Sequence, residues 1–374
     1  MLLKPSVAGR PVRAQVGVGI RGMPWGSVLG LAALSLLTAC SGPAEQETSS
    51  ESTEPASTES TSTMPAAAVA ELPEAQFHLT RDQTHARFSS TIPPVLTVPS
   101  GAVISVETEE ATDGQLSPES TVDEVAKVAF DPIHPLTGPV FIEGAEPGDV
   151  LKVELLEIEL GAWGWAGIFP GFGFLADEFD QPYLKTFRFE PGQEDVEFVP
   201  GVRVPLRPFP GVVGVAPATE EMLSTIPPRA NGGNMDDREL TEGVTVYLPI
   251  FVEGALFSIG DTHAAQGDGE VSGTAIEAPT RILLRVEVLK GARPIAEPQY
   301  EHEDFYAVTA FGETLDEAAK KATRYMVDYL VEERGLERQD AYVLASIAGR
   351  LKIAEVVDVP HMLVTMKMPK SVFE

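Results

Sequence analysis

A short stretch in the second half of the chain places an aspartate and a histidine two positions apart. It reads Gly260-Asp261-Thr262-His263. Side chains at positions i and i+2 of a strand point to the same side, so Asp261 and His263 can meet one ion or one water molecule. A catalytic divalent cation uses imidazole nitrogen and carboxylate oxygen as ligands and keeps one position open for water. By itself this spacing indicates a candidate metal site.

Further acids, amides and glycines flank this stretch on both sides. Gly267-Asp268-Gly269-Glu270 follows it, and the segment 231–237 (NGGNMDD) precedes it. Glycine lets the backbone turn sharply and approach a ligand closely. Asp268-Gly269 is also a common hairpin turn, so this part by itself favours a simple turn. Isolated histidines such as His85 and His134 are more often structural than catalytic.

Composition and missing motifs exclude several classes of function. The only cysteine, Cys40, lies near the N-terminus, so the globular part has neither a disulfide nor a catalytic thiol. The sequence contains no Gly-x-Ser-x-Gly elbow, no P-loop and no strand-linked G-x-G-x-x-G. The net charge of −29 argues against binding to nucleic acid, which requires clustered Lys and Arg. An acidic surface weakly favours a neutral or cationic small substrate.

The N-terminus has the features of an export signal. Four basic residues and no acid precede an apolar segment, 25–39, which is shorter than the roughly 20 residues of a membrane span. Leu37-Thr38-Ala39-Cys40 resembles the bacterial lipobox, in which the cysteine is lipidated. Residues 1–39 are therefore predicted to be a lipoprotein signal peptide, although an ordinary signal peptide or an uncleaved anchor is the alternative. Residues 40–75 are acidic and rich in Ser, Thr and Pro, which predicts a disordered tether.

Residues 76–374 read as one mainly β (α+β) domain. Short β-type runs at 95–106, 150–159, 245–252 and 281–289, separated by Gly and Pro, favour a sandwich or barrel. A capping box at Thr314-Leu315-Asp316-Glu317 opens a predicted helix that runs to Glu333. A second helix is expected at 337–347 and a strand pair at 351–357 and 362–367. The aromatic, glycine-rich segment 161–180 is either core filling or the wall or lid of a pocket.

Several ordered blocks carry a resemblance to a known family. They are HPLTGPV (134–140), EGAEPGDVL (143–151), PFPGVVGVAP (208–217), IPPR (226–229), GGNMD (232–236), GALFS (254–258) and GDTHAAQGDGE (260–270). From about Phe77 to Phe373 the chain resembles the acetamidase/formamidase family. The resemblance implies a jelly-roll-like β-sandwich core with added α/β elements and C-terminal helices. It also implies hydrolysis of small amides to carboxylate and ammonia, with a bound divalent metal, zinc or calcium.

The resemblance also suggests roles for individual residues. It implies that Asp236, Asp261 and His263 bind the metal or position the water. Glu270 is the first candidate for the general base and Glu146 the second. His134 and the backbone near Gly232-Gly233 are candidates for binding the developing oxyanion. The expected substrate-binding residues are Gly232, Gly233, Asn234 and Asp268.

One departure from the family concerns location. Typical members are soluble intracellular enzymes without a lipobox or a tether, whereas this chain is expected to be anchored through Cys40 outside the cytoplasm, in the cell envelope. Export leaves the substrate open between formamide or acetamide and another linear or cyclic amide. The alternative function is that of a non-catalytic lipoprotein that binds metal or ligand on the same fold. A homo-oligomer, a dimer, is expected, with the C-terminal helices as one candidate interface.

Overall fold

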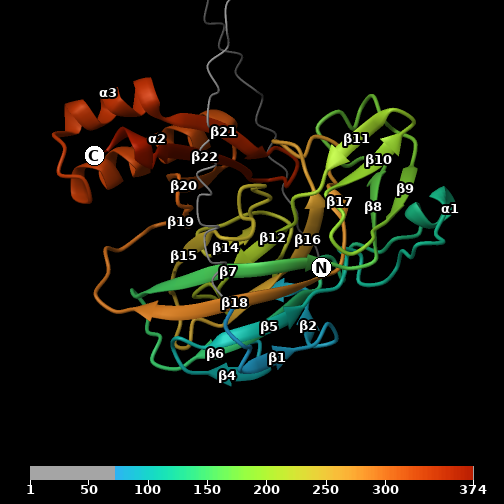
Figure 1. Cartoon of the computed structure of the whole chain (residues 1–374), viewed down its shortest axis with the longest axis horizontal. Helices are drawn as coiled ribbons and strands as arrows, with labels where there is room; N and C mark the ends of the chain where they lie inside the picture. The colour runs from blue at the N-terminus through green and yellow to red at the C-terminus, as the bar shows by residue number, and fades with distance from the viewer. Residues whose placement is uncertain (1–71, 374) are drawn as a thin grey trace, which may run out of the picture. The chain divides into compact units, whose positions relative to one another are not determined.

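A computed structural model describes residues 72–373 of the chain as part of one compact unit. The predicted signal peptide, Cys40 and most of the predicted tether lie outside the described residues. Two large β-sheets and a pair of C-terminal helices make up the unit (Figure 1). The prediction of a mainly β fold with C-terminal helices is confirmed. Among residues 72–373, no helix is both long enough and apolar enough to span a bilayer.

The first sheet has nine strands. In spatial order they are β1 (Phe77–Leu79), β5 (Val103–Glu107), β18 (Thr280–Leu289), β7 (Val150–Leu160), β15 (Thr245–Pro249), β19 (Gln299–Glu301), β20 (Phe305–Gly312), β22 (Met362–Pro369) and β21 (Arg350–Glu355). All neighbours are antiparallel except β1 and β5.

The second sheet carries the segments of interest for function. Its main order is β14 (Gly232–Asn234), β12 (Phe209–Gly214), β16 (Phe257–Ala265), β17 (Ile276–Glu277), β8 (Trp163–Ile168) and β9 (Tyr183–Arg188). A branch adds β6 (Leu136–Ile142), which pairs with β16, β2 (Thr84–His85) and β4 (Leu96–Val98). The minor elements are β3 (Arg87–Phe88), β13 (Leu223–Ser224), the hairpin β10 (Asp195–Val199) and β11 (Val202–Pro205), and the short helix α1 (Val122–Val125).

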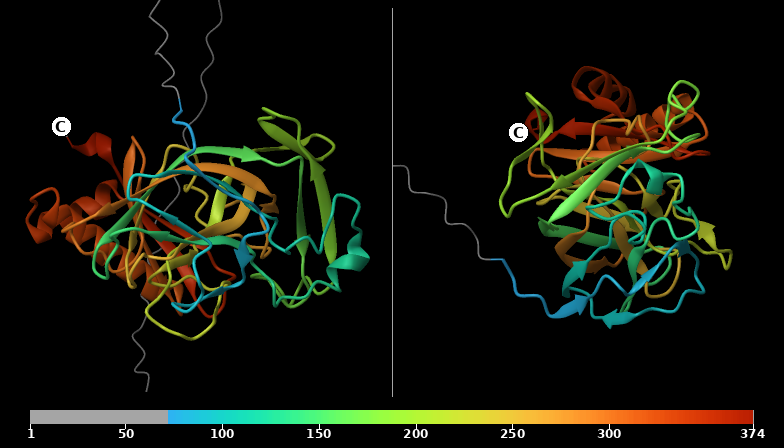
Figure 2. Two further views of the ribbon diagram at one scale, coloured as in Figure 1. Left: turned by 90° about the horizontal axis from the view of Figure 1, so that it is seen from below. Right: turned by 90° about the vertical axis from the view of Figure 1, so that its right-hand side faces the viewer.

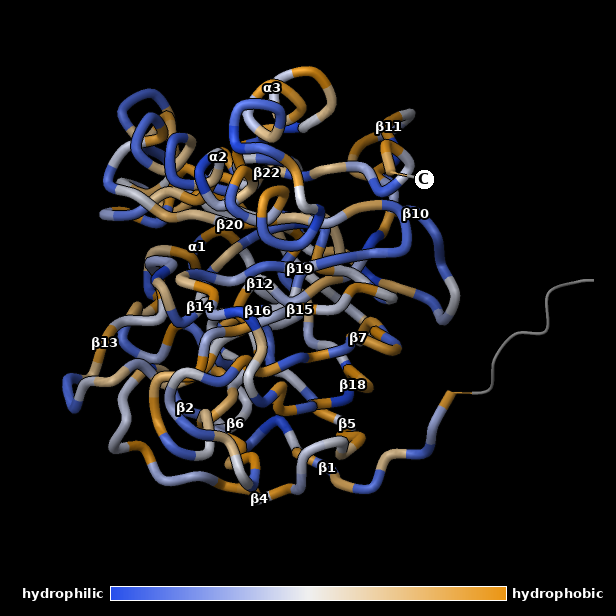
Figure 3. The backbone as a smooth tube through the Cα atoms, turned by 90° about the vertical axis from the view of Figure 1, so that its left-hand side faces the viewer, coloured by the Kyte–Doolittle hydropathy of each residue, from blue (hydrophilic) through white to orange (hydrophobic). Residues whose placement is uncertain are grey.

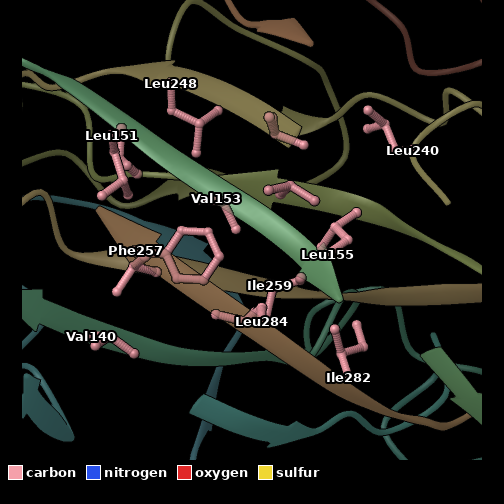
Figure 4. Close-up of a cluster of buried hydrophobic side chains, with 14 of the residues drawn as sticks. Val140, Leu151, Val153, Leu155, Leu240, Leu248, Phe257, Ile259, Ile282 and Leu284 are labelled. Atoms are coloured by element: carbon pink, nitrogen blue, oxygen red, sulfur yellow. The ribbon is translucent and has the colours of Figure 1, made fainter. Parts of the chain in front are cut away.

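The main core lies between the two sheets. Alternation along β7 turns Leu151, Val153 and Leu155 inward. They meet side chains of β16 from the opposite sheet, including Phe257 and Ile259 (Figure 4). Each fully buried aliphatic side chain of this kind contributes about 1.5–3 kcal/mol relative to an exposed one. The two sheets are therefore held at a fixed separation, which gives β16 a rigid support.

The C-terminal helices form a second core on the first sheet. Thr314 caps α2 (Leu315–Glu332) by accepting a hydrogen bond from the Glu317 amide at 3.2 Å, as the capping box predicts. Helix α2 and α3 (Arg338–Ala348) pack on β20 and β22. Figure 3 shows hydrophilic and hydrophobic residues in both helices. The views in Figure 2 place these helices at the end of the unit opposite the β10–β11 hairpin.

Candidate active site

A small cavity opens beside β16, where the neighbours of this strand change. The first half of β16 pairs with β6, ending with Gly260 opposite Leu136, and the second half pairs with β17, beginning with His263 opposite Glu277. Asp261 lies between these two pairings, so no strand covers it on that side. The predicted motif therefore sits at a gap in the second sheet, and β6 and β17 border that gap.

Two side chains enter the gap from these strand ends. His134 lies just before β6, and its Nε2 is 3.7 Å from Asp261 Oδ2. Glu277 lies in β17, and its Oε2 is 3.1 Å from His263 Nε2. Asp261 and His263 point to the same side of β16, as the i, i+2 spacing predicts, with Asp261 Oδ1 3.6 Å from His263 Nε2. Four groups, from β16, β17 and the segment just before β6, thus lie close together.

Asp236 completes this group from the loop after β14. Its Oδ1 is 3.7 Å from His263 Nδ1, and ligand atoms of Asp236, Asp261 and His263 all lie within 4.8 Å of one another. Gly211 of β12 lies behind them, opposite Asp261 in the strand register. A Cβ at position 211 would be 2.8 Å from His263 Cε1 and closer still to Asp236 Oδ1. Only glycine therefore leaves room for the three side chains to approach.

Gln266 determines which nitrogen of His263 can bind a metal. Its Nε2 donates to the Asp236 carbonyl at 2.7 Å, which leaves Oε1 to accept from His263 Nδ1 at 2.8 Å. In the neutral imidazole, Nδ1 therefore carries the hydrogen and Nε2 carries the lone pair, on the side of Asp261 and Glu277. Such an outer hydrogen bond is the usual way in which a protein orients a metal-binding histidine.

The donor atoms in this cluster fit a divalent cation. The cavity is bordered by five carboxylates and two histidines and by no lysine or arginine. Asp236 Oδ1 is buried and accepts no hydrogen bond, and neither does Glu277 Oε2, whose one charged neighbour is His263 at 3.1 Å. A buried charge without a partner is costly, so a cation among these oxygens would remove a large penalty. A mixed set of imidazole and carboxylate ligands suits zinc, and the surplus of oxygen atoms also suits calcium.

The pKa values of the carboxylates indicate the same unbalanced negative charge. Burial raises the pKa of Asp236 to about 8, against the opposing effect of His263. The pKa of Glu270 is raised well above its usual value, first by burial and then by the nearby Asp236. The pKa of Asp358 is also raised well above its usual value, first by burial and then by the neighbouring Glu355. A bound cation reverses this tendency by favouring the charged carboxylates.

Asp261 and His263 behave differently because they face each other. Burial acts to raise the pKa of Asp261, but His134 and His263 outweigh it and lower the pKa. For His263, burial acts to lower the pKa, but Glu277 and Asp261 raise it well above its usual value. Without a metal, His263 is thus the positive partner of the acids. A divalent cation would replace its proton and leave Nε2 free to coordinate.

The backbone is strained at three of these acids. Asp236, Asp261 and Glu270 have φ values of 40°, 50° and 44°, in the left-handed region that favours glycine. Such conformations cost about 1–3 kcal/mol each and persist where the surrounding structure enforces them. Their concentration at one cavity indicates a functional site.

A second layer of acids comes from the turn between β21 and β22. Asp358 lines the cavity, and Asn234 Nδ2 donates to Asp358 Oδ2 at 2.7 Å. Glu355 accepts from the amides of Val357 and Asp358 at 2.9 and 3.1 Å. Asn234 Oδ1 is buried without a partner, so it can accept a hydrogen bond from a ligand. The C-terminal strands therefore contribute directly to the site.

Aromatic side chains form part of the cavity wall. Trp165, Phe169 and Phe172 line the cavity, so part of segment 161–180 is a pocket wall. The cavity offers ≈ 50 Å³ to the centres of water-sized molecules. Since one water needs about 10–15 Å³ on this measure, there is room for roughly three to five water-sized groups. Acetamide, with four non-hydrogen atoms, is of this size.

Some of the predicted site residues lie elsewhere. Glu146 is on an exposed turn before β7 and pairs with Lys290 at 3.0 Å, outside the cavity. The position of Glu146 therefore does not support its predicted role as a general base. Asp268 is half-exposed, pairs with Lys352 at 3.1 Å and does not line the cavity either.

The predicted glycine pair also lies outside the cavity lining. Gly232 and Gly233 pair with β12, and the Gly232 amide donates to the Arg229 carbonyl at 3.1 Å. That amide is therefore not free to bind an oxyanion. A Cβ on Gly232 would clash with the Val213 carbonyl oxygen of β12, and the φ of Gly232 is +85°, so this glycine is needed for the close approach of β14 to β12.

Three site residues were not anticipated from the sequence. Glu277 and Asp358 are single acids in the apolar runs Ala275–Ala278 and Val356–Val359, a pattern that could have marked them as buried and functional. Gly211 had no signal beyond its place in the PFPG block, since the need for glycine arises from His263 across the strand pair.

Comparison with known proteins identifies the family of this chain. The sequence pattern of the Acetamidase/Formamidase family matches residues 73–225 and 218–374, and the chain belongs to this family. It is 34% identical to an acetamidase from Mycolicibacterium smegmatis over 275 residues, covering 56% of this chain and 68% of that protein. A formamidase from Methylophilus methylotrophus is 27% identical over 365 residues, covering 78% and 90%. The solved structure of an acetamidase from Bacillus halodurans is similar with a TM-score of 0.74 and 33% identity, covering 79% of this chain and 98% of that one.

Proposed function

We propose that this protein is an amidohydrolase that cleaves a small neutral amide, such as formamide or acetamide, to carboxylate and ammonium. One water is consumed, and its oxygen replaces nitrogen on the carbonyl carbon. The observation that carries the proposal is the cavity itself. Buried carboxylates and histidines face an apolar wall across a space of ≈ 50 Å³, which suits a short amide. The non-catalytic alternative has no observation in its favour among the described residues.

The residues that would hold a divalent cation, zinc or calcium, are Asp236, Asp261 and His263, with Glu277 as an additional ligand. The unpartnered oxygens of Asp236 and Glu277 support this assignment. When bound, the cation would polarise the substrate carbonyl and lower the pKa of a bound water far below that of bulk water, to about 7 in favourable cases.

The protein's own groups then handle the proton and the substrate. Glu270, buried at the cavity edge, accepts the proton of the attacking water and returns it to the leaving nitrogen. His134 donates a hydrogen bond to the developing oxyanion. The free Oδ1 of Asn234 accepts from the amide NH₂ and orients it. The aromatic wall holds the acyl group and excludes water.

Ammonia release from a panel of amides tests the proposal. The wild-type protein is compared with Glu270→Gln, which keeps the shape of the side chain but cannot take up a proton. We expect release by the wild type and a loss of at least about 100-fold in the variant, as is usual when general acid–base catalysis is removed. Metal content is measured in both proteins, because Glu270→Gln should retain its metal. If the wild-type protein contains metal but releases no ammonia from any of the amides, the proposed amidohydrolase activity is refuted.

We further propose that the protein is exported and anchored to the membrane of the bacterial cell envelope through lipidated Cys40. The support is the order of basic, apolar and lipobox-like segments at 1–40, followed by the acidic segment 41–75. Palmitate labelling and membrane fractionation of the full chain test this. The Cys40→Ala variant should lose both the label and the membrane association, and an unlabelled wild type would contradict the anchor.

A homodimer is the proposed assembly. Helix α3 exposes Tyr342, Val343 and Ile347, with Ile347 76% exposed. The neighbouring β21 is an edge strand of the first sheet. Apolar side chains on an exposed helix often mark an interface. Ile347→Glu should convert a dimer to a monomer in sedimentation experiments, and a monomeric wild type would refute the proposal.

A further inference from the structure

Three phenylalanines surround the apolar end of the cavity, and we call them the aromatic collar. Phe130 lies between α1 and His134, whereas Phe169 and Phe172 follow β8. The ring of Phe130 contacts both others edge-on, with centroids 5.8 Å from Phe169 and 6.2 Å from Phe172. All three rings line the same cavity as the acids and histidines. The collar is therefore formed by two loops that meet over the site.

Phe130 marks the mouth of the cavity. It is 46% exposed, whereas every other lining residue is buried or half-buried. Trp165, Phe169 and the acids lie deeper, each less than 9% exposed. A substrate that reaches the acids must pass Phe130 or end against it.

The rest of the collar is held in place from behind. Trp165 contacts Phe169 edge-on at 5.8 Å, and its Nε1 donates to the buried Glu110 at 2.7 Å. Phe172 lies directly over Gly273, where a Cβ would come within 2.5 Å of its ring. These rings cannot move further into the protein. The position of the Phe130 ring therefore limits the distance that a bound substrate can span between the acids and the mouth of the cavity.

We propose that Phe130 is a specificity-determining residue that limits the acyl group of the substrate to a few carbon atoms. This inference rests on the proposed amidohydrolase function. With room for roughly three to five water-sized groups, formamide and acetamide fit behind the ring. The chain of a longer amide would have to occupy the volume of the Phe130 ring.

The experiment compares kcat/KM for formamide, acetamide, butanamide and hexanamide in the wild type and in Phe130→Ala. We expect the hexanamide-to-acetamide ratio to rise at least about tenfold in the variant, since one methylene group in an apolar pocket changes discrimination by 10-fold or more. Phe174→Ala is the matched control. Phe174 is 56% exposed in the same loop region but does not line the cavity, so its removal should leave the ratio unchanged.

The outcomes separate the two proposals. If the wild type hydrolyses none of the amides, the proposed function fails. If it hydrolyses acetamide but Phe130→Ala leaves the ratio unchanged, or Phe174→Ala raises it equally, the role of Phe130 is overturned. Phe130→Leu, which keeps an apolar contact, should give a smaller rise in the same direction. If Phe130→Ala does not fold, the test rests on Phe130→Leu. An unchanged hexanamide-to-acetamide ratio in Phe130→Leu would then overturn the inference.

Discussion

Replacing Gly211 with alanine should disable the site without touching any group that reacts. The added Cβ would lie 2.8 Å from His263 Cε1 and 2.9 Å from the Asp261 carbonyl oxygen, with Asp236 Oδ1 nearer still. Real Cβ atoms essentially never come within 3.0 Å of such neighbours. Asp236 must therefore move by more than about 0.5 Å, which is the tolerance of a productive site.

The size of the effect follows from this crowding. The surrounding side chains are about 1–2% exposed, so none can move into solvent. Overpacking of a buried site costs about 1–3 kcal/mol in the free energy of unfolding. A misplacement approaching 1 Å lowers a rate by about 100-fold, so we expect kcat/KM to fall by about 10- to 100-fold. Weaker metal binding should accompany this loss.

Amide hydrolysis, metal content after dialysis and urea unfolding measure the three effects. Gly267→Ala is the control, because Gly267 has ordinary backbone angles and no atom lies within 4 Å of its added Cβ. Wild-type activity and metal content in Gly211→Ala would refute the packing argument. An equal loss in Gly267→Ala would show that the effect is not specific to the space behind His263.

Three further results are expected. Glu277→Gln removes a negative charge 3.1 Å from His263 Nε2, so its metal affinity should fall at least about tenfold in chelator competition, and unchanged affinity would exclude Glu277 as a ligand. Glu146→Gln should keep kcat/KM within about twofold because Glu146 is on the surface, and a tenfold loss would restore its predicted role. Burial lowers the pKa of His85 to about 4, against the effect of its hydrogen bond to the Arg87 carbonyl, from about 6.5 when unfolded. The unfolded state therefore binds more protons between these values. The contribution of His85 to stability should fall by about 3 kcal/mol as the pH drops from about 6.5 to 4. The same titration in His85→Gln should lack this component, and identical pH profiles would contradict the pKa shift.

Local patterns predicted much of the fold. The capping box at Thr314 correctly placed the start of α2, because the hydroxyl and the Glu317 amide that it binds are three residues apart. Alternation placed β7, β15 and β18 within a few residues of their observed ends. It predicted two β-type runs around a Pro-Ser-Gly turn in segment 95–106, but not that the first run, β4, pairs with β6 in parallel while the second, β5, pairs with β18. Pairing depends on which distant strands compete for an edge, and a single segment does not contain that information.

The neighbouring acids Asp236 and Asp237 show where sequence reasoning stops. Both are fully buried. Asp236 faces the cavity, whereas Asp237 faces the first sheet, where it accepts from Tyr300 at 2.7 Å and pairs with Lys352 at 2.6 Å. The second contact lowers the pKa of Asp237 despite its burial. One acid is therefore available for chemistry and the other anchors the loop, a distinction that depends on partners far along the chain.

By itself, the sequence determined the features that depend on nearby residues. It located the Asp261–His263 pair on one face of a strand, the helix cap at Thr314 and the ordered blocks that mark the family. The tertiary structure alone decided how the site is completed. Glu277, Asp358 and Gly211 come from separate strands and turns, and they meet only because β16 changes partners at the gap and the β21–β22 turn reaches across it. A cavity lined by segments more than 100 residues apart is a property of packing between sheets, and no local pattern encodes it.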